Sequence, residues 1–354
     1  MTVKVAIIAD DLTGALDTGT PFVDAGLSVA VAIDVSAISE TLATGCEVVV
    51  VNTASRALPE EEAAGRVSAA AKALLAASPQ IVLKKIDSRL KGNVAAESVA
   101  LAAVFGHETI VVAPAIPDQD RLTHNGHVVG RGVDKPLPIA ELFDASGGTE
   151  VLVRDAETDS DLDQVVEARD WKRALAVGAR GIGAALARKI GQSNRTSNAF
   201  AASSRTVFAF GSRDPITTAQ MARLEGTGCL AAAIDASMGA VPSDAQVGLP
   251  LLVRCTGEIS GEAVAVADRF AKGVKSIIEM TRPDMLMVGG GDTALAVFRE
   301  LGIRVLRPQG EIEAGIPWFD VVTADGLRLR CAVKSGGFGN SDSLVRLIAQ
   351  NQAA

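Results

Sequence analysis

Two adjacent carboxylates follow the first apolar run of the chain. Asp10 and Asp11 come directly after residues 3–9, a pattern that predicts a buried strand. Ligands of open α/β sheets bind outside the carboxyl ends of the strands, so these acids are placed to hold hydroxyl groups or to accept a proton. A helix cap formed by Asp11 or Thr13 is the structural alternative. Because a cap needs only one such side chain, the adjacent pair favours the functional interpretation.

A basic segment, KKIDSRLKGN, leaves a later apolar run at residues 84–93. Its cations, hydroxyl and glycine turn form a seat for a small carboxylate or phosphate, and the guanidinium of Arg89 suits bidentate pairing. The alternative is a solvated basic loop followed by a helix cap at Asn93. Lysines within the strand itself would be unusual for such a loop.

Another polar loop, APAIPDQDRLTHNGH, occupies residues 113–127 after the fifth apolar run. The spacing of His124 and His127 is compatible with a metal, but no third ligand is apparent and the segment is not an HExxH helix. Hydrogen bonding to a substrate by Arg121, Asn125 or His127 is the favoured interpretation.

Three glycine-rich segments follow apolar runs in the second half: GSRDP from residue 211, GGGDTA from 289 and KSGGFG from 334. Free backbone N–H groups at a helix N-terminus bind phosphate, and glycines let that backbone approach it. Tight turns packed by Asp292 are the alternative. Neither GxxxxGK(S/T) nor an opening GxGxxG occurs, which disfavours a standard P-loop or Rossmann domain. The expectation is a different nucleotide site, in which Lys334 approaches phosphates and Asp292 positions Mg²⁺ or a water of its shell.

These segments must be positioned by strands and helices, and short apolar runs do alternate with longer amphipathic segments. The pattern predicts an α/β fold: two α/β domains with mainly parallel sheets and an active-site cleft between them. Residues 191–205 lose periodicity and are rich in Ser and Asn, which places the linker there and the domains at 1–200 and 205–354. The expected strands are 3–9, 28–33, 47–52, 81–86, 109–113, 206–210, 229–234, 251–255, 285–288 and 329–333, and the expected helices are 58–77, 93–105 and 261–280.

Composition narrows the function classes. The 354 residues are 48% hydrophobic, 21% charged and 3% aromatic, which excludes disorder, collagen and coiled coil. A net charge of -8 disfavours nucleic acid and anionic membranes as partners. The four cysteines lie far apart without metal-binding spacing, so we expect four buried free thiols. With no targeting segment and no apolar stretch of membrane-spanning length, the expected location is cytoplasmic.

These motifs together resemble the four-carbon acid sugar kinase family, whose members phosphorylate threonate, erythronate and 3-oxo-tetronate. The resemblance spans nearly the whole chain and rests on ADDLTGALD, KKIDSRLKGN, APAIPDQDRLTHNGH, GSRDPITTAQ, GGGDTA and KSGGFG. It implies an N-terminal domain that binds the acid sugar and a C-terminal domain that binds ATP. Residues expected at the substrate are Asp10, Asp11, Lys85, Asp87, Ser88, Arg89, Arg121 and Asn125; those expected at ATP are Ser212, Gly289, Gly290, Gly291, Asp292, Thr293, Lys334, Gly336 and Gly337.

The sequence therefore predicts an ATP-dependent kinase that uses Mg²⁺ and phosphorylates a tetronate on its C4 hydroxyl, with Asp10 or Asp11 as the proton acceptor. Two alternatives stay open: an NAD-dependent hydroxyacid dehydrogenase, which the missing GxGxxG disfavours, and a non-catalytic sugar-acid sensor, which has no need of phosphate loops. The metal ligands, the tetronate isomer and the oligomeric state are left open, with a homodimer as one option.

Overall fold

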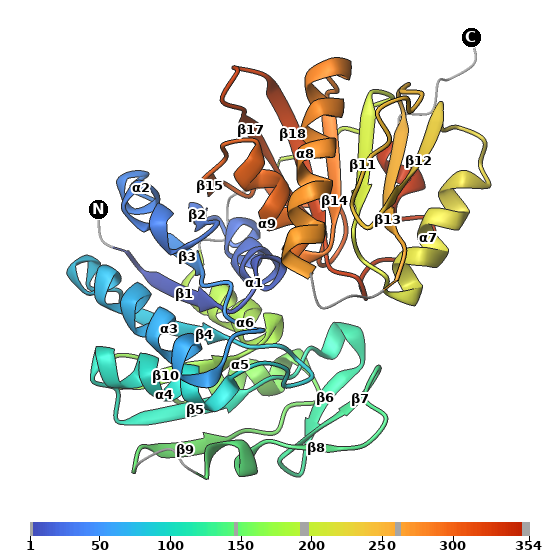
Figure 1. The fold of residues 1–354 in the computed structure, drawn as a ribbon. Helices are drawn as coiled ribbons and strands as arrows, with labels where there is room; N and C mark the ends of the chain where they lie inside the picture. The colour runs from blue at the N-terminus through green and yellow to red at the C-terminus, as the bar shows by residue number, and fades with distance from the viewer. Residues whose placement is uncertain (1–2, 145–147, 192–197, 259–262, 349–354) are drawn as a thin grey trace. The chain divides into compact units, whose positions relative to one another are not determined.

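The computed structural model describes residues 3–144, 148–191, 198–258 and 263–348. The chain divides into two compact units, Met1–Ser197 and Asn198–Ala354 (Figure 1). The sequence suggested domains at 1–200 and 205–354; residues 192–197 of the expected linker lie outside the described residues. Each unit is an α/β structure.

Apolar runs form the parallel sheet of the first unit, in which the strand order is β2-β3-β1-β4-β10-β5-β9. Its central strands are buried at every position, as strands covered by helices on both faces must be. The strands are β1 (Val5–Ala9), β2 (Val29–Ala32), β3 (Val48–Asn52), β4 (Ile81–Lys85), β5 (Thr109–Ala113), β9 (Glu150–Val153) and β10 (Ala174–Gly178).

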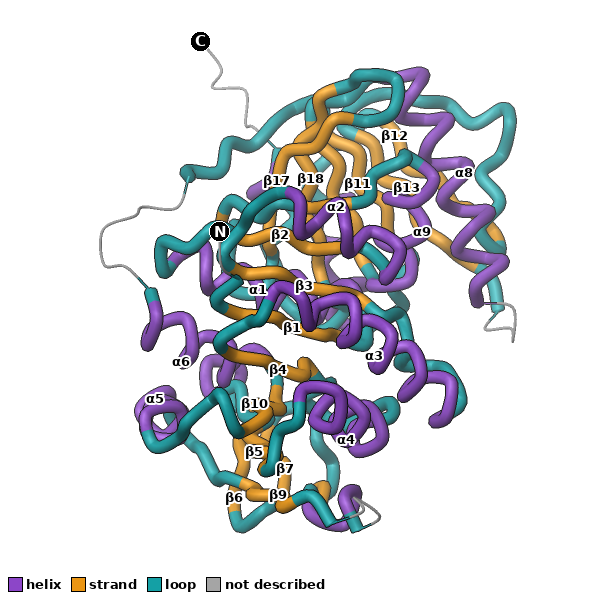
Figure 2. The backbone as a smooth tube through the Cα atoms, turned by 90° about the vertical axis from the view of Figure 1, so that its left-hand side faces the viewer, coloured by secondary structure: helices purple, strands orange, loops and turns teal. Residues whose placement is uncertain are grey.

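Helices cover both faces of this sheet. The chain leaves β1 toward β2 in one direction and leaves β3 toward β4 in the other, so right-handed crossovers place their helices on opposite faces. Figure 2 shows α3 and α4 on one side of the strands and α5 and α6 on the other. The helices are α1 (Leu12–Asp24), α2 (Ile38–Ala43), α3 (Glu60–Leu74), α4 (Val94–Phe105), α5 (Asp159–Glu167) and α6 (Arg180–Ile190).

A small antiparallel sheet is inserted between β5 and β9. It consists of β6 (Arg121–His124), β7 (His127–Gly130) and β8 (Leu137–Pro138). The hairpin between β6 and β7 turns at Asn125 and Gly126, which both have positive φ. The sequence indicated only a polar loop here, because these strands are short and mostly polar.

The second unit has a sheet in the order β12-β13-β11-β14-β18-β17-β16, parallel from β12 to β18 and antiparallel beyond. Its core includes Phe208, Met287 and Trp318. The strands of this sheet are β11 (Thr206–Phe210), β12 (Ala232–Ser237), β13 (Leu251–Thr256), β14 (Met285–Gly289), β16 (Gly310–Glu311), β17 (Pro317–Val322) and β18 (Arg328–Lys334). The short strand β15 (Val305–Leu306) lies outside it, and the helices are α7 (Pro215–Glu225), α8 (Ala263–Thr281) and α9 (Gly291–Glu300).

The predicted α/β class with mainly parallel sheets is confirmed. One strand is displaced: β12 begins at Ala232 rather than Cys229, after a turn at residues 226–228 in which Gly228 has φ +68°. Strands β9, β10 and β17 were not anticipated. Among the described residues, no helix is both long enough and apolar enough to cross a membrane.

Candidate functional site

The acid pair at the end of β1 is held by an arginine from the neighbouring strand exit. Arg56 follows β3 and donates to Asp10 from Nε at 2.7 Å and from Nη2 at 2.8 Å. The same guanidinium reaches Asp11 from Nη1 at 2.8 Å, and Asp87, after β4, lies 3.7 Å from that atom. Because β3, β1 and β4 are adjacent in the sheet, three strand exits deliver these charges to one point.

The structural alternative for Asp11 is realised in this site. Asp11 is the N-cap of α1, where its Oδ1 accepts from the Gly14 amide at 2.8 Å and its Oδ2 from the Thr13 hydroxyl at 2.7 Å. Asp11 nevertheless keeps 16% of its side chain exposed, against 3% for Asp10. Of the two acids, Asp11 is the one that a small molecule can reach.

The ionisation of Asp10 is controlled by its charged neighbours. Burial alone raises the pKa of this carboxyl, but Lys84, Arg56 and Lys85 together outweigh burial and lower it below its ordinary value. Burial likewise opposes the charge on Arg56, yet Asp11, Asp10 and Asp87 raise the pKa of the guanidinium. At neutral pH Asp10 is therefore an anion and Arg56 a cation, and the guanidinium group holds the Asp10 carboxylate in place.

The two strand lysines that the sequence marked as unusual have buried partners. Lys84 Nζ lies 2.8 Å from Glu97 Oε2, both side chains being at most 1% exposed, and Ser55 Oγ donates to Glu97 Oε1 at 2.7 Å. Lys85 Nζ donates to the Ile86 carbonyl at 2.7 Å. A Cβ built on Gly14 would lie 2.8 Å from Lys85 Nζ, so that ammonium group stands against the first turn of α1.

Guanidinium groups gather beyond the β4 exit. Arg121 donates from Nη1 to Ser88 Oγ at 2.6 Å and from Nε to the Arg131 carbonyl at 3.1 Å. A Cβ built on Gly132 would lie 3.6 Å from Arg121 Nη2 and 3.7 Å from Arg89 Nη1. The chain thus brings Arg89 and Arg121 to the same spot, and adds Arg131 beside them. We call Arg89, Arg121 and Arg131 the arginine cluster.

The electrostatics of the arginine cluster are those of an anion site. Burial and then the like charges of Arg89 and Arg131 lower the pKa of Arg121, while Asp87 acts in the opposite direction. Asp87 accepts from the Arg89 backbone amide at 2.9 Å and also faces Arg56. Because the positive charges of Arg89 and Arg131 act on Arg121, a small anion that bound here would be stabilised.

Asn125 does not join this group, contrary to the sequence-based expectation. It occupies the tip of the β6–β7 hairpin, where its backbone amide donates to Asp155 Oδ2 at 2.8 Å. At about 3.3 Å per residue, four strand positions separate it from Arg121 by roughly 13 Å. His124 pairs with Glu157 and His127 Nδ1 contacts the Asn125 carbonyl, so both histidines serve the hairpin.

In the second unit, the glycine segments meet at the carboxyl ends of adjacent strands. The Gly211 amide donates to the Gly289 carbonyl at 3.1 Å, and the Gly290 amide donates to the Lys334 carbonyl at 3.0 Å. A side chain on Gly211 would overlap Thr293 Oγ1. Because β11, β14 and β18 are neighbours, their three exits form one edge lined by backbone, which we call the glycine edge.

Helix α9 begins at that edge with its first amides uncovered by a capping side chain. Its N-cap is Gly290, which has φ +103° and no side chain with which to bind the first-turn N–H groups. Helix α7 differs, because Asp214 caps it by accepting from the Ile216 amide at 2.9 Å. The N-terminus of α9 is accordingly the stronger candidate for a phosphate.

Close packing accounts for the glycine of the KSGGFG segment. A Cβ on Gly336 would lie 2.6 Å from Ser212 Oγ and 2.7 Å from the Asp214 Cβ. The Gly336 carbonyl accepts from Thr217 Oγ1 at 2.8 Å. Ser212 and Gly336 therefore lie side by side, whereas Gly337 has open space, its nearest neighbour being Asp214 Oδ2 at 3.7 Å.

Lys334 has a different role from the one expected. Its side chain is fully buried, and its Nζ donates within the loop to Thr217 Oγ1 at 2.8 Å and to the carbonyls of Ser335, Gly336 and Phe338 at 3.0 Å. The ammonium group is committed to these oxygens, so we correct the expected phosphate contact: Lys334 holds the glycine loop in shape.

Carboxylates for a metal are sparse at the glycine edge. Asp292 opens α9 and Asp214 caps α7. Within the described ranges, no three His, Cys, Asp or Glu side chains gather as a metal-binding group. Such a donor set fits a Mg²⁺ that keeps waters and binds mainly through substrate phosphates, with one protein carboxylate.

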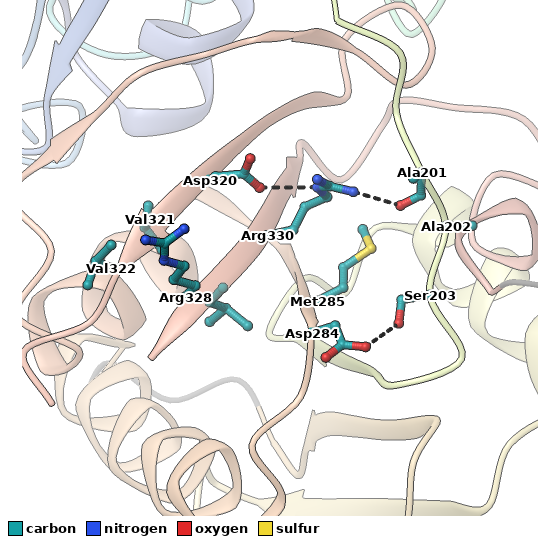
Figure 3. A pocket seen from close by; sticks show the side chains of 11 residues that line it. Ala201, Ala202, Ser203, Asp284, Met285, Asp320, Val321, Val322, Arg328 and Arg330 are labelled. Carbon is teal, nitrogen blue, oxygen red and sulfur yellow. Dashed lines mark hydrogen bonds and ion pairs between the residues drawn. The ribbon is translucent and has the colours of Figure 1, made fainter. Parts of the chain in front are cut away.

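Two cavities of the second unit lie at opposite edges of its sheet. The larger, about 610 Å³, is at the amino ends of β14 and β18, where Arg330 contacts Asp320 and the Ala201 carbonyl, each at 3.1 Å (Figure 3). The smaller, about 260 Å³, adjoins Gly211 and Thr293 at the carboxyl ends. Only the smaller one borders the glycine edge.

Sequence reasoning missed Arg56, Arg131 and Glu97. Arg56 stands four residues past an expected strand, so the strand-exit argument applied to Asp10 would have found it. Arg131 follows a hairpin that was not anticipated, and Glu97 is buried in a helix whose pattern did not mark that position. Arg131 and Glu97 carried no signal of their own in the sequence.

Comparisons with known proteins match two family models to separate parts of the chain. A family model described as a sugar-binding N-terminal domain matches residues 5–141, and one described as a nucleotide-binding C-terminal domain matches residues 252–344. The chain is 29% identical to a D-threonate kinase of Bordetella bronchiseptica over 97% of this chain and 96% of the relative. It is 25% identical to a 3-oxo-tetronate kinase of Methylobacterium radiotolerans over 98% and 99%.

Solved structures show the same fold. A protein of Salmonella typhimurium LT2 superposes with a TM-score of 0.76 at 22% identity, over 99% of this chain and 100% of that one. Haemophilus influenzae protein HI1011, of family DUF1537, superposes with a TM-score of 0.69 at 20% identity, over 97% and 98%. At these identities the likeness establishes the fold and carries no residue roles.

Proposed function

Because this chain belongs to the four-carbon acid sugar kinase family, we propose that it is an ATP-dependent kinase that phosphorylates a four-carbon sugar acid. The arginine cluster is the observation that carries the substrate class. Arg121 lies in the field of the like charges of Arg89 and Arg131, which Asp87 opposes, and a substrate carboxylate would add negative charge at this point. A neutral polyol of the same length offers no such charge.

The acid pair receives the hydroxyl end of the substrate in this proposal. Asp11, the more exposed acid, binds the reacting hydroxyl and takes its proton as the phosphoryl group transfers. Asp10, with both oxygens on Arg56, keeps the guanidinium and Asp11 in place. Phosphoryl transfer needs mainly alignment and charge neutralisation, which a rigid ion network supplies.

The glycine edge of the second unit binds ATP in this proposal. Amides of Gly291 and Asp292 at the start of α9, together with Ser212 and the loop of Gly336 and Gly337, receive the phosphates. Asp292 is the carboxylate that would hold a nucleotide-bound Mg²⁺, which neutralises charge on the phosphates. Transfer to the C4 hydroxyl gives a phosphate ester at the end opposite the carboxylate.

A coupled assay of ADP release tests the proposal. The purified protein is supplied with MgATP and, separately, with isomers of threonate, erythronate and 3-oxo-tetronate, with erythritol and threitol as neutral controls. We expect ADP release with at least one acid and with neither polyol, and a 4-phosphate ester by ³¹P-coupled NMR of the product. Turnover of the polyols at the same rate, or no response to any short sugar acid, would overturn it. Titration with NADH in parallel distinguishes a dehydrogenase.

A further inference from the structure

The smaller cavity of the second unit has two unlike walls. Gly211 and Thr293 belong to the glycine edge and close one side of the cavity. Val266, Ala267 and Phe270, on one face of α8, close the other, and Phe270 is only 1% exposed. Cys255, near the end of β13, completes the apolar wall. The cavity thus has the glycine edge on one side and an apolar wall on the other.

Polar groups also line this cavity, beside the apolar wall. Arg213 donates from Nη2 to the Glu258 carbonyl at 3.2 Å, which links the loop after β11 to the loop after β13. Asp292 also lines the cavity, beside the first turn of α9. An apolar interior with a few polar groups that fix orientation is typical of a small-molecule site.

From this continuity, and resting on the proposed function, we propose that the cavity binds the nucleoside part of ATP, with the base against the α8 wall of Val266, Ala267 and Phe270. The phosphates then extend past Gly211 and Thr293 to the amides of α9. A flat aromatic base buries its faces against apolar side chains, whereas phosphates require the N–H groups at the other end.

The other cavity of this unit does not compete for the role. It opens where β14 begins, at Asp284 and Met285 (Figure 3). The first amides of α9 follow the other end of β14. Four strand steps of about 3.3 Å separate Met285 from Gly289, roughly 13 Å along the strand. At the end of β18, Gly336 packs so closely against Ser212 and Asp214 that a base does not fit between them.

Two cysteines, Cys229 and Cys255, are half-exposed, whereas the sequence predicted that all four would be buried, and these two make the proposal testable. Cys255 lines the cavity. Cys229 lies between α7 and β12, where its Sγ contacts Thr227 Oγ1 at 2.7 Å, and serves as the internal control. Cys46 and Cys331 are buried, and burial raises the pKa of the Cys331 thiol further. The native protein is alkylated with iodoacetamide, and each cysteine is followed by peptide mass spectrometry.

The alkylation is run without ligand, with adenosine, with MgATP and with inorganic tripolyphosphate. We expect adenosine and MgATP to slow modification of Cys255 at least tenfold and to leave Cys229 unchanged, and tripolyphosphate to slow neither. If ATP binds by calorimetry while Cys255 reacts at its original rate, or if tripolyphosphate protects it equally, the proposal is wrong and the kinase assignment stands. If no ATP binding is detected, the proposed function fails first.

A cavity-filling variant gives an independent measurement. It tests the proposal even when Cys255 is alkylated too slowly to be followed. In Ala267→Trp the indole occupies the space assigned to the base, and in the matched control Ala265→Trp it projects from an exposed position on the same helix. We expect KM for ATP to rise at least tenfold in the first variant and less than twofold in the second, with KM for the sugar acid unchanged in both. Equal KM values for ATP in the two variants would contradict the proposal.

Discussion

The candidate sites of the two units occupy equivalent positions in their sheets but are built from different parts of the chain. In the first unit, the exits of β3, β1 and β4 deliver charged side chains, and Arg56 bonds Asp10 and Asp11 directly. In the second, the exits of β11, β14 and β18 deliver glycines, and α9 begins beside them without a capping side chain on its first amides. A sugar acid has to be held by directed charges, whereas phosphates are bound well by backbone N–H groups.

This difference determines what makes each site fragile. A site of buried charges depends on complete pairing, because an ion left alone in the interior is strongly destabilising. A site of backbone amides depends on close approach, because one added methyl group can close it. Substitutions should therefore damage the first site through lost partners and the second through added atoms.

The largest effect is expected from Arg56→Gln. It leaves Asp10, which is 3% exposed, without both of its hydrogen bonds, and should lower the free energy of unfolding by about 3–5 kcal/mol. Urea unfolding at pH 7 measures this, with turnover expected to fall by two orders of magnitude or more. The control is Arg66→Gln, whose exposed pair with Glu62 is worth about 0–1 kcal/mol. Equal stability of the two variants would contradict an obligatory role of Arg56 in pairing.

Gly211→Ala tests the second site by adding atoms. The new Cβ would overlap Thr293 Oγ1, so the glycine edge must open, and we expect the affinity for ATP to fall by about 10–100-fold, or about 1.4–2.8 kcal/mol. Calorimetric titration with MgATP measures it. Gly65→Ala is the control, since it faces open space on α3 and should stabilise the protein by up to about 1 kcal/mol. Undiminished ATP affinity in Gly211→Ala would argue against the glycine edge.

An effect of similar size is expected from Arg131→Gln. It removes one charge from the arginine cluster, and loss of one charge-assisted hydrogen bond, about 1.5–3 kcal/mol, should raise KM for the sugar acid roughly tenfold or more. KM for ATP should stay the same. Lys135→Gln removes the same charge from an exposed position of the following loop and should leave both constants within twofold. If both variants raise KM equally, the long-range field and not the cluster attracts the acid.

The smallest effect concerns Lys334, whose ammonium group is buried at the glycine edge. Burial lowers the pKa of Lys334 to about 8, although Asp214 and Glu313 oppose it. The unfolded chain therefore binds more protons than the native protein between pH 8 and the ordinary lysine pKa, so this group makes stability rise with pH there, by at most about 1.4 kcal/mol per unit.

Comparison with Lys334→Met isolates this contribution. Urea unfolding from pH 7.5 to 9.5 should show the wild type gaining stability relative to the variant as pH increases, because methionine takes up no proton. A constant difference across that range would mean that Lys334 stays charged in the folded protein, held so by the four oxygens around it.

Much of the fold was predictable because apolar runs and glycine-rich exits are local signals. The strand ending at Ala9 and the helix beginning near Glu60, with its acidic first turn, follow from neighbouring residues alone. The hairpin that carries Asn125 away from Arg121 depends on pairing between short polar strands, which local patterns do not reveal.

The candidate site was predictable only in part, for a related reason. Asp10 and Arg89 stand at strand exits, which the sequence marks. The partner of Asp10 comes from 46 positions away, and the partner of Lys84 is Glu97 on a helix. Lys334 likewise looked like a phosphate ligand because sequence shows the charge but not the carbonyls that fold around it.

The buried pair of Lys84 and Glu97 limits how this protein can change over generations. Replacing either residue alone leaves a charge in the core at a cost of about 3–5 kcal/mol, whereas replacing both with apolar residues of similar size can be nearly neutral. A single substitution at Lys84 or Glu97 is therefore strongly disfavoured, and we expect the pair to be replaced only when both residues change. Ser55 donates to Glu97 and also contacts Thr53 Oγ1 at 2.7 Å, so in that change it would lose one hydrogen bond and keep the other.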